Sequence, residues 1–335
     1  MPRRLIDLAG GKPLLDIASY ARRGPGRRDR LSQEEVELIE RTVRRTPEVM
    51  VKVLSRGGQD LKAVARHVEY LNRGGDLELE TDDGQRLLGR GVEKELLEDW
   101  DLDLEERRTG GLEYWSRRNP PKLVHKLMFS MPAGTPSDKV LAAVKSFARE
   151  EFGLKHRYAL VLHTDEPHPH VHMVVKAVSE RGVRLNIRKE TLRRWRTSFA
   201  RNLRACGVEA NATQRAVRGV TTPRQTDGIY RAALRGASTH WNQRAESAAL
   251  ARDGEERFPT EAYKARLRET RRLVSNGWNE VAKDLDKQGQ ASLARAVRQY
   301  AVELPPVRTE LEHTWAQESR LDRIAIRGAN DAPTR

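Results

Sequence analysis

The chain has 335 residues, with 62 lysines and arginines against 48 aspartates and glutamates, a net charge of +14 and a pI near 10.1. This length suits two modest domains, and the excess of positive charge favours a polyanionic partner such as nucleic acid. No apolar stretch has the length of a membrane span or a secretion signal, and one cysteine, Cys206, excludes an internal disulfide or a thiolate metal cage, so we expect a cytoplasmic protein without membrane insertion.

Residues 1–45 are expected to form a basic arm and one short helix. Residues 1–32 contain Gly-Pro turns and the arginine run ARRGPGRRDR, without a sustained apolar period. A Ser-x-x-Glu capping box that begins at Ser32 then opens an amphipathic segment. The arm is basic enough to contact a phosphate backbone.

Residues 46–215 alternate strand and helix patterns, which predicts an α/β (α+β) domain. From Val49 a β-branched alternating run predicts a strand, and LKAVARHVEYLNRGG has helical spacing with a glycine stop. DLELETDDGQRLLG reads as a hairpin around an Asp-Asp-Gly turn, and a single helix is expected from about Val92 to Glu106.

The second half of this domain continues the alternation. KLVHKLMFSMPAG predicts a strand, SDKVLAAVKSFAREEFG a helix and HRYALVLHT another strand, before the histidine-rich stretch and a helix that ends at Gly207. Strand patterns stop near Val220, so residues 216–335 are expected to be a helical C-terminal region. The sequence has no G-x-x-x-x-G-K-[ST] loop, which excludes an attached helicase motor of that type.

The stretch HTDEPHPHVH, residues 163–172, places four of the nine histidines within ten positions. Alternate side chains of a strand share a face, so His168, His170 and His172 are expected to point the same way. A tight turn at TDEP would bring His163, at the end of the preceding strand, beside them. Three or four imidazoles can then converge on one point.

Converging neutral imidazoles predict a divalent metal site that leaves the ion most of its charge for a substrate oxygen, which suits phosphate chemistry. Asp165 is placed to accept the second N–H of one histidine, or alternatively to take a proton. Two other interpretations stay open: solvated histidines on a surface strand, and a structural zinc site with Asp165 or His168 as fourth ligand.

The histidine array resembles the third motif of conjugative relaxases, the His-hydrophobe-His (HUH) single-strand endonucleases, and especially the branch that contains the T-DNA border endonuclease. EYLNRGGDLELE, residues 69–80, is similar to the family's tyrosine motif, and SMPAGT, residues 130–135, to its second motif. The motifs occur in the family's order and cover residues 49–215. One departure is Lys176, where the family often has an asparagine.

The resemblance implies a central antiparallel sheet flanked by helices, with the histidine strand central and the Tyr70 helix facing it. It implies that Tyr70 is the nucleophile and that His163, His170 and His172 hold Mg²⁺ or Mn²⁺, although Zn²⁺ would also bind such a shell. Ser130 would contact the DNA backbone near the cut, and Asp165 would assist the chemistry. His168 is expected to contact the outer shell or DNA.

The resulting hypothesis is a relaxase that nicks single-stranded DNA at a transfer origin through a covalent 5′-phosphotyrosyl intermediate, with relaxosome accessory proteins and a coupling ATPase as possible partners. A rolling-circle replication initiator and a non-catalytic DNA-binding protein with a structural metal are the alternatives. A few further basic residues are candidates to contact phosphates: Arg66, Arg73, Lys176, Arg188, Lys189, Arg193 and Arg194.

Overall fold

The structure is a computed structural model, and it describes residues 30–54, 58–109, 121–220, 243 and 260–308. The chain divides into two compact units. Residues 44–212 form a sheet unit, and residues 30–43 group with the described part of 213–335 in a helical unit. Within the described residues, no helix is both long and apolar enough to cross a membrane.

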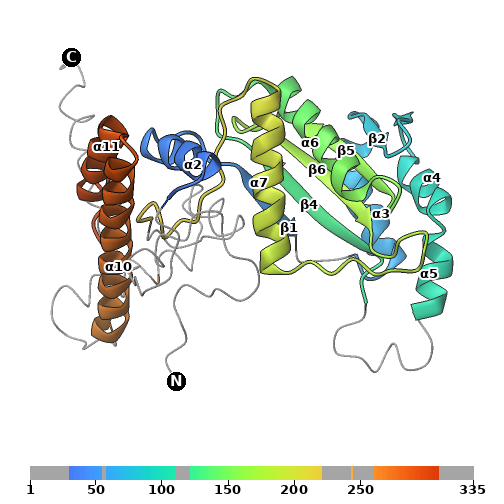
Figure 1. Ribbon diagram of the computed structural model, residues 1–335. Coiled ribbons are helices and arrows are strands. Elements are labelled where there is room, and N and C mark those ends of the chain that lie inside the picture. Colours follow the sequence, from blue (N-terminus) through green and yellow to red (C-terminus); the bar gives the residue numbers. More distant parts are fainter. Residues whose placement is uncertain (1–29, 55–57, 110–120, 221–242, 244–259, 309–335) are drawn as a thin grey trace, which may run out of the picture. The chain divides into compact units, whose positions relative to one another are not determined.

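The sheet unit is built on a six-stranded antiparallel sheet in the order β1-β4-β6-β5-β2-β3 (Figure 1). Its strands are β1 (Met50–Leu54), β2 (Leu79–Thr81), β3 (Arg86–Leu87), β4 (Val124–Ser130), β5 (Tyr158–His163) and β6 (His170–Lys176). The histidine strand β6 lies between β4 and β5, so the expected central antiparallel sheet is confirmed.

Two helices cover one face of this sheet, α6 (Ser137–Phe152) and α7 (Lys189–Ala205) (Figure 1). Phe147 of α6 and Trp195 of α7 lie on the apolar faces of these helices. They pack in one core with Phe129 of β4 and Met173 of β6. Aromatic rings meet edge-on here, with 6.1 Å between the centroids of Phe147 and Trp195. Burial of this large apolar area anchors the sheet.

Three shorter helices belong to the core on the other face: α3 (Leu61–Leu71), α4 (Val92–Asp99) and α5 (Leu102–Thr109). Val64 and Val68 of α3 pack there with Val161 and Val174 of the sheet. The expected single helix from Val92 to Glu106 is wrong, because Asp101 adopts a left-handed φ of 49° and breaks it into α4 and α5.

The helical unit consists of α2 (Gln33–Val43), α10 (Thr260–Lys287) and α11 (Ala291–Val302). The capping box is present, because Ser32 Oγ accepts the Glu35 N–H at 3.2 Å and the Glu35 carboxylate accepts the Ser32 N–H at 2.8 Å. Ile39 of α2 packs with Trp278 and Val297 of the C-terminal helices. The expected helical C-terminal region is therefore confirmed, and the N-terminal helix belongs to its core.

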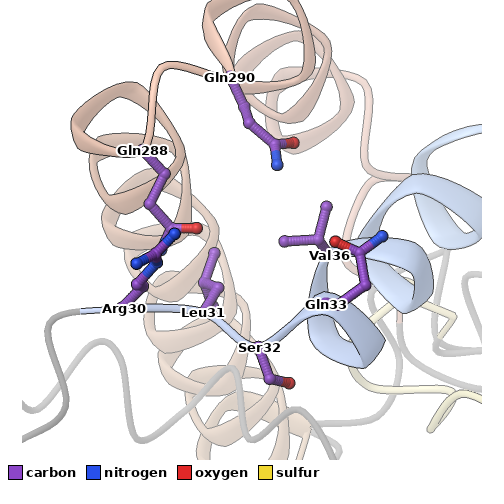
Figure 2. Close-up of a pocket in the computed structure, with 7 residues that line it drawn as sticks. All are labelled: Arg30, Leu31, Ser32, Gln33, Val36, Gln288 and Gln290. Carbon is purple, nitrogen blue, oxygen red and sulfur yellow. The ribbon is translucent and has the colours of Figure 1, made fainter.

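A polar hollow lies beside the turn between α10 and α11 and the start of α2 (Figure 2). Arg30, Ser32, Gln288 and Gln290 are among the residues that line it. All of its lining residues belong to the helical unit.

Candidate active site

Three histidines meet where β5 ends and β6 begins. His163 and His170 are partners across the β5–β6 pair, and His172 follows two residues later on the same face. The ring centroids lie 5.2 Å apart for His163 and His170, 4.7 Å for His163 and His172, and 5.2 Å for His170 and His172. One nitrogen of each lies within 4.8 Å of the others, a spacing that suits one shared ion.

Backbone carbonyls orient two of the rings. His170 Nδ1 donates to the His168 carbonyl at 3.0 Å, and because a carbonyl only accepts, Nε2 of His170 keeps its lone pair. His163 Nε2 donates in the same way to the Leu71 carbonyl at 2.7 Å, which leaves the lone pair on Nδ1. His172 Nδ1 is closed off from solvent without a hydrogen-bond partner in the described part of the chain.

Burial keeps His163 and His172 neutral at neutral pH. Burial lowers the pKa of His172 to about 3, and the neighbouring His163 and His170 act in the same direction. Burial also lowers the pKa of His163, against the opposing effect of the Leu71 carbonyl. Neutral imidazoles are the form that binds metal, so these three residues could hold a divalent cation.

Tyr70 lies in the last turn of α3, and its side chain is 55% exposed. Asp60 caps the start of this helix by accepting the Ala63 N–H at 2.7 Å. At the other end, the bond from His163 to the Leu71 carbonyl attaches the residue next to Tyr70 to the histidine cluster. The apolar face of α3 and this polar contact therefore place Tyr70 beside the cluster.

Arg73 connects Tyr70 to the histidine hairpin. Its guanidinium carbon lies 4.9 Å from the centroid of the Tyr70 ring, and it forms an ion pair with Asp165. The same Nη2 atom lies 3.3 Å from His163 Nδ1. One planar cation thus contacts the phenol, the carboxylate and one of the three histidines.

These contacts show in the pKa values. The pKa of Arg73 is raised, first by its interaction with the Tyr70 side chain and then, against the effect of burial, by Asp165. For Asp165, burial acts to raise the pKa, but Arg73, a backbone hydrogen bond and His163 together outweigh it, so the pKa falls below its usual range. Asp165 is therefore ionised and Arg73 charged at neutral pH.

The turn after α3 has little conformational freedom. Arg73 itself has a left-handed φ of 55°, which is uncommon for a residue with a side chain. At Gly75, with φ 111°, an added Cβ would lie 2.5 Å from the Gly89 carbonyl carbon. The Gly89 N–H donates to the Gly75 carbonyl at 3.1 Å, so the two segments stay in contact and hold the turn that carries Arg73.

Among the other candidates, Ser130 is the residue of β4 paired with His170, and its side chain is buried. The expectation that His168 belongs to the histidine face of the strand is wrong, because β6 begins at His170 and His168 is exposed in the connection before it. The Asp-Glu-Pro segment uses more residues than a tight turn. Lys176 is buried at the far end of β6, and its ammonium lies 3.3 Å from Glu180.

The remaining basic candidates fall on two different faces. Arg66 is exposed on α3, one turn before Tyr70. The others lie at the start of α7 or on it, and α7 packs on the sheet face opposite to the histidines: Arg188, Lys189, Arg193 and Arg194. The structure therefore brings Arg66 and Arg73 to the face that carries the histidines, and Lys176 lies on the same face at the far end of β6. The DNA contacts of all these residues stay predictions.

Three features of this face were not predicted from the sequence. The Leu71 carbonyl is a backbone group and leaves no signal in the side-chain pattern. His67 stacks on Tyr70 with 6.4 Å between ring centroids, and its position three residues earlier on a helix could have indicated this. Lys126 lies four residues before Ser130 on β4 and therefore on the same face, which the two-residue period of a strand could have indicated.

Comparison with known proteins agrees with this geometry. Residues 93–207 match the family model described as "Relaxase: MobA/VirD2-like, nuclease domain". This part of the chain is therefore similar to the nuclease domain of VirD2-related relaxases. The T-DNA border endonuclease VirD2 of Agrobacterium fabrum is 26% identical to this chain over 202 residues, and that of Rhizobium rhizogenes is 27% identical over 191 residues.

The alignments cover 55% and 52% of this chain, and 43% and 42% of those relatives. The chain thus spans less than half the length of the VirD2 proteins that it matches. Its family segment contains Ser130, Asp165 and the three clustered histidines, whereas Tyr70 and Arg73 precede it.

Proposed function

We propose that the chain is a metal-dependent, strand-specific DNA endonuclease and strand transferase that nicks a transfer origin and stays attached to the 5′ end through Tyr70. The observation that carries this proposal is the contact chain from Tyr70 through Arg73 to Asp165 and His163, beside a histidine cluster in a relaxase nuclease domain. Conjugative DNA transfer in a bacterial cytoplasm would be its setting.

The residues present fit a metal ion. Three imidazole nitrogens converge, and His172 has a buried nitrogen without a partner among the described residues. A bound divalent ion would draw electrons from the scissile phosphate and stabilise charge on its oxygens. We propose Mn²⁺ or Mg²⁺ as the working ion. Zn²⁺ would bind three imidazoles more tightly by the usual affinity order.

The chain's own residues account for the transfer step. The Tyr70 oxygen attacks the phosphorus of one phosphodiester and loses its proton to solvent. The bond to the 3′ oxygen breaks, and that oxygen takes a proton from solvent to become a free 3′-hydroxyl. The Arg73 guanidinium beside the phenol stabilises the phenolate. Because Asp165 is ionised and paired, we assign it the role of orienting Arg73. The new phosphotyrosyl ester conserves the energy of the broken linkage, so rejoining needs no ATP.

The experiment is incubation with single-stranded DNA that carries the transfer origin, in Mn²⁺, followed by denaturing electrophoresis. We expect a covalent protein–DNA adduct with the wild-type protein and a loss of roughly 10³-fold or more in adduct formation with Tyr70→Phe. Tyr158→Phe is the matched control, since Tyr158 is buried in the core on the opposite sheet face. Equal adduct formation by Tyr70→Phe and wild type would refute the assignment.

A further inference from the structure

Lys126 shares the sheet face that carries the histidines. Along β4, Ser130 is paired with His170 and Met128 with His172, and Lys126 is the next residue on the same side. Two residues of a strand span about 7 Å, so Lys126 is about 7 Å along β4 from the residue beside His172. A strand of DNA with one phosphodiester at the histidines could present a neighbouring one to Lys126.

Among the described residues, Lys126 has no partner of the kind that a buried lysine ordinarily has. The residue is 5% exposed, yet no hydrogen bond or ion pair joins its ammonium to any described residue. The aliphatic stem of Lys126 is packed, whereas its Nζ atom is still accessible to solvent. Lys176, the other buried lysine of this sheet, is paired with Glu180.

The charges around Lys126 do not neutralise it. Burial lowers its pKa, the nearby Asp60 opposes this, and Lys122 and Arg66 act in the same direction as burial. The Asp60 carboxylate is already engaged with the Ala63 N–H at the start of α3. His67 adds no negative charge, and burial lowers its pKa to about 4. The surroundings therefore hold more positive than negative charge.

A lysine with a packed stem and no counter-ion among the described residues costs stability, because its ammonium is partly desolvated, and such groups call for an explanation. A singly charged anion would remove the cost, and the chemistry next door requires a chain of such anions. We propose that Lys126 binds a phosphate of the DNA strand next to the one at the histidine cluster, with Arg66 at the rim of this subsite. This inference rests on the proposed function and extends it to how the strand is held.

The subsite is tested by the salt dependence of binding. The full chain is titrated with a short oligo-deoxythymidine strand in EDTA, so that binding is measured without cleavage. One lost phosphate contact lowers the slope of log affinity against log salt concentration by about 0.7 for single-stranded DNA. We expect this decrease for Lys126→Met, together with an affinity loss of about tenfold at moderate salt. Lys126→Arg should keep the wild-type slope.

Lys139→Met is the matched control, because Lys139 is exposed on α6, over the opposite face, and the net charge changes equally. It should leave the slope unchanged. The thermal midpoint separates binding from packing: removal of an unpartnered ammonium should leave the midpoint of Lys126→Met equal or higher. If Lys126→Met does not fold, Lys126→Gln takes its place.

An unchanged slope for a folded Lys126 variant would overturn the subsite, and so would a clearly lower thermal midpoint, because that would reveal a partner inside the protein. The adduct assay is independent of this result. If Lys126→Met lowers the salt slope but the wild-type protein forms no adduct, the phosphate contact is retained and the nicking reaction is rejected. If the wild-type protein forms the adduct but the slope of Lys126→Met is unchanged, the nicking reaction is retained and the phosphate contact is rejected.

Discussion

Arg73 and Asp165 pair across 92 positions of sequence and join the turn after α3 to the connection between β5 and β6. The pair lies at the surface, with side chains 32% and 51% exposed. Surface ion pairs contribute little to stability, typically about 0–1 kcal/mol. Its importance should therefore lie in where it holds the Arg73 guanidinium, beside Tyr70.

Asp165→Asn should separate these two contributions. We expect the thermal midpoint to stay close to that of the wild type, and the rate of adduct formation to fall by roughly 10- to 100-fold, because Arg73 loses the charge that orients it. Asp103→Asn, which removes the exposed Arg107–Asp103 pair on α5, should leave both quantities unchanged. Equal rates for the two variants would show that the Arg73–Asp165 pair has no part in the reaction.

Metal affinity should depend on the clustered histidines and not on their exposed neighbour. His172→Ala removes one of three converging nitrogen donors, so Mn²⁺ affinity measured by calorimetry should fall by at least about tenfold. His168→Ala should bind Mn²⁺ as the wild type does, because His168 offers the cluster only its backbone carbonyl. A loss of equal size in His168→Ala would mean that a fourth imidazole joins the site.

The turn that carries Arg73 offers a matched pair of glycines. Gly75→Ala should destabilise the sheet unit by about 1–3 kcal/mol and slow adduct formation, since its Cβ would collide with the Gly89 backbone. Gly74→Ala meets nothing within 4 Å and has only its φ of 69° to oppose it, so its effect should be smaller, about 1 kcal/mol. Thermal melts of the two variants decide; equal midpoints would contradict the steric argument.

Stability should fall between pH 6.5 and pH 4 in part through His125. Burial lowers its pKa from 6.5 to about 4, with the charge of Lys122 acting in the same direction, while its Nε2 donates to the Leu185 carbonyl at 3.2 Å. In this window His125 is protonated in the unfolded chain but neutral in the folded protein, so the free energy of unfolding decreases as the pH falls.

His125→Gln removes that titration. From pH 7 to pH 5 the urea midpoint, followed by tryptophan fluorescence, should fall less for His125→Gln than for the wild type. The other buried histidines, among them His67, titrate equally in both proteins and cancel in the comparison. An identical decrease in the two proteins would mean that His125 has the same pKa in the folded and the unfolded chain.

Much of the fold could be predicted from local patterns. Alternation of apolar residues placed the strands that became β4, β5 and β6, and helical spacing with a glycine stop placed α3. The histidine array was visible for the same reason, because strand alternation and one short connection suffice to bring His163 beside His170. The wrong prediction of a single helix across Asp101 also has a local cause. Asp101 interrupts the helical pattern with a left-handed φ, and no glycine marks the position in the sequence.

The sequence by itself therefore determined the sheet, its histidine strand and the candidate nucleophile, because each depends on neighbours in the chain or on a family motif. Only the tertiary structure decided the role of Arg73, since its contacts with His163 and Asp165 lie 90 and 92 positions away. It also decided that Lys126 faces the site while α7 covers the other face, because the side of a sheet that a helix packs on follows from the burial of both faces together.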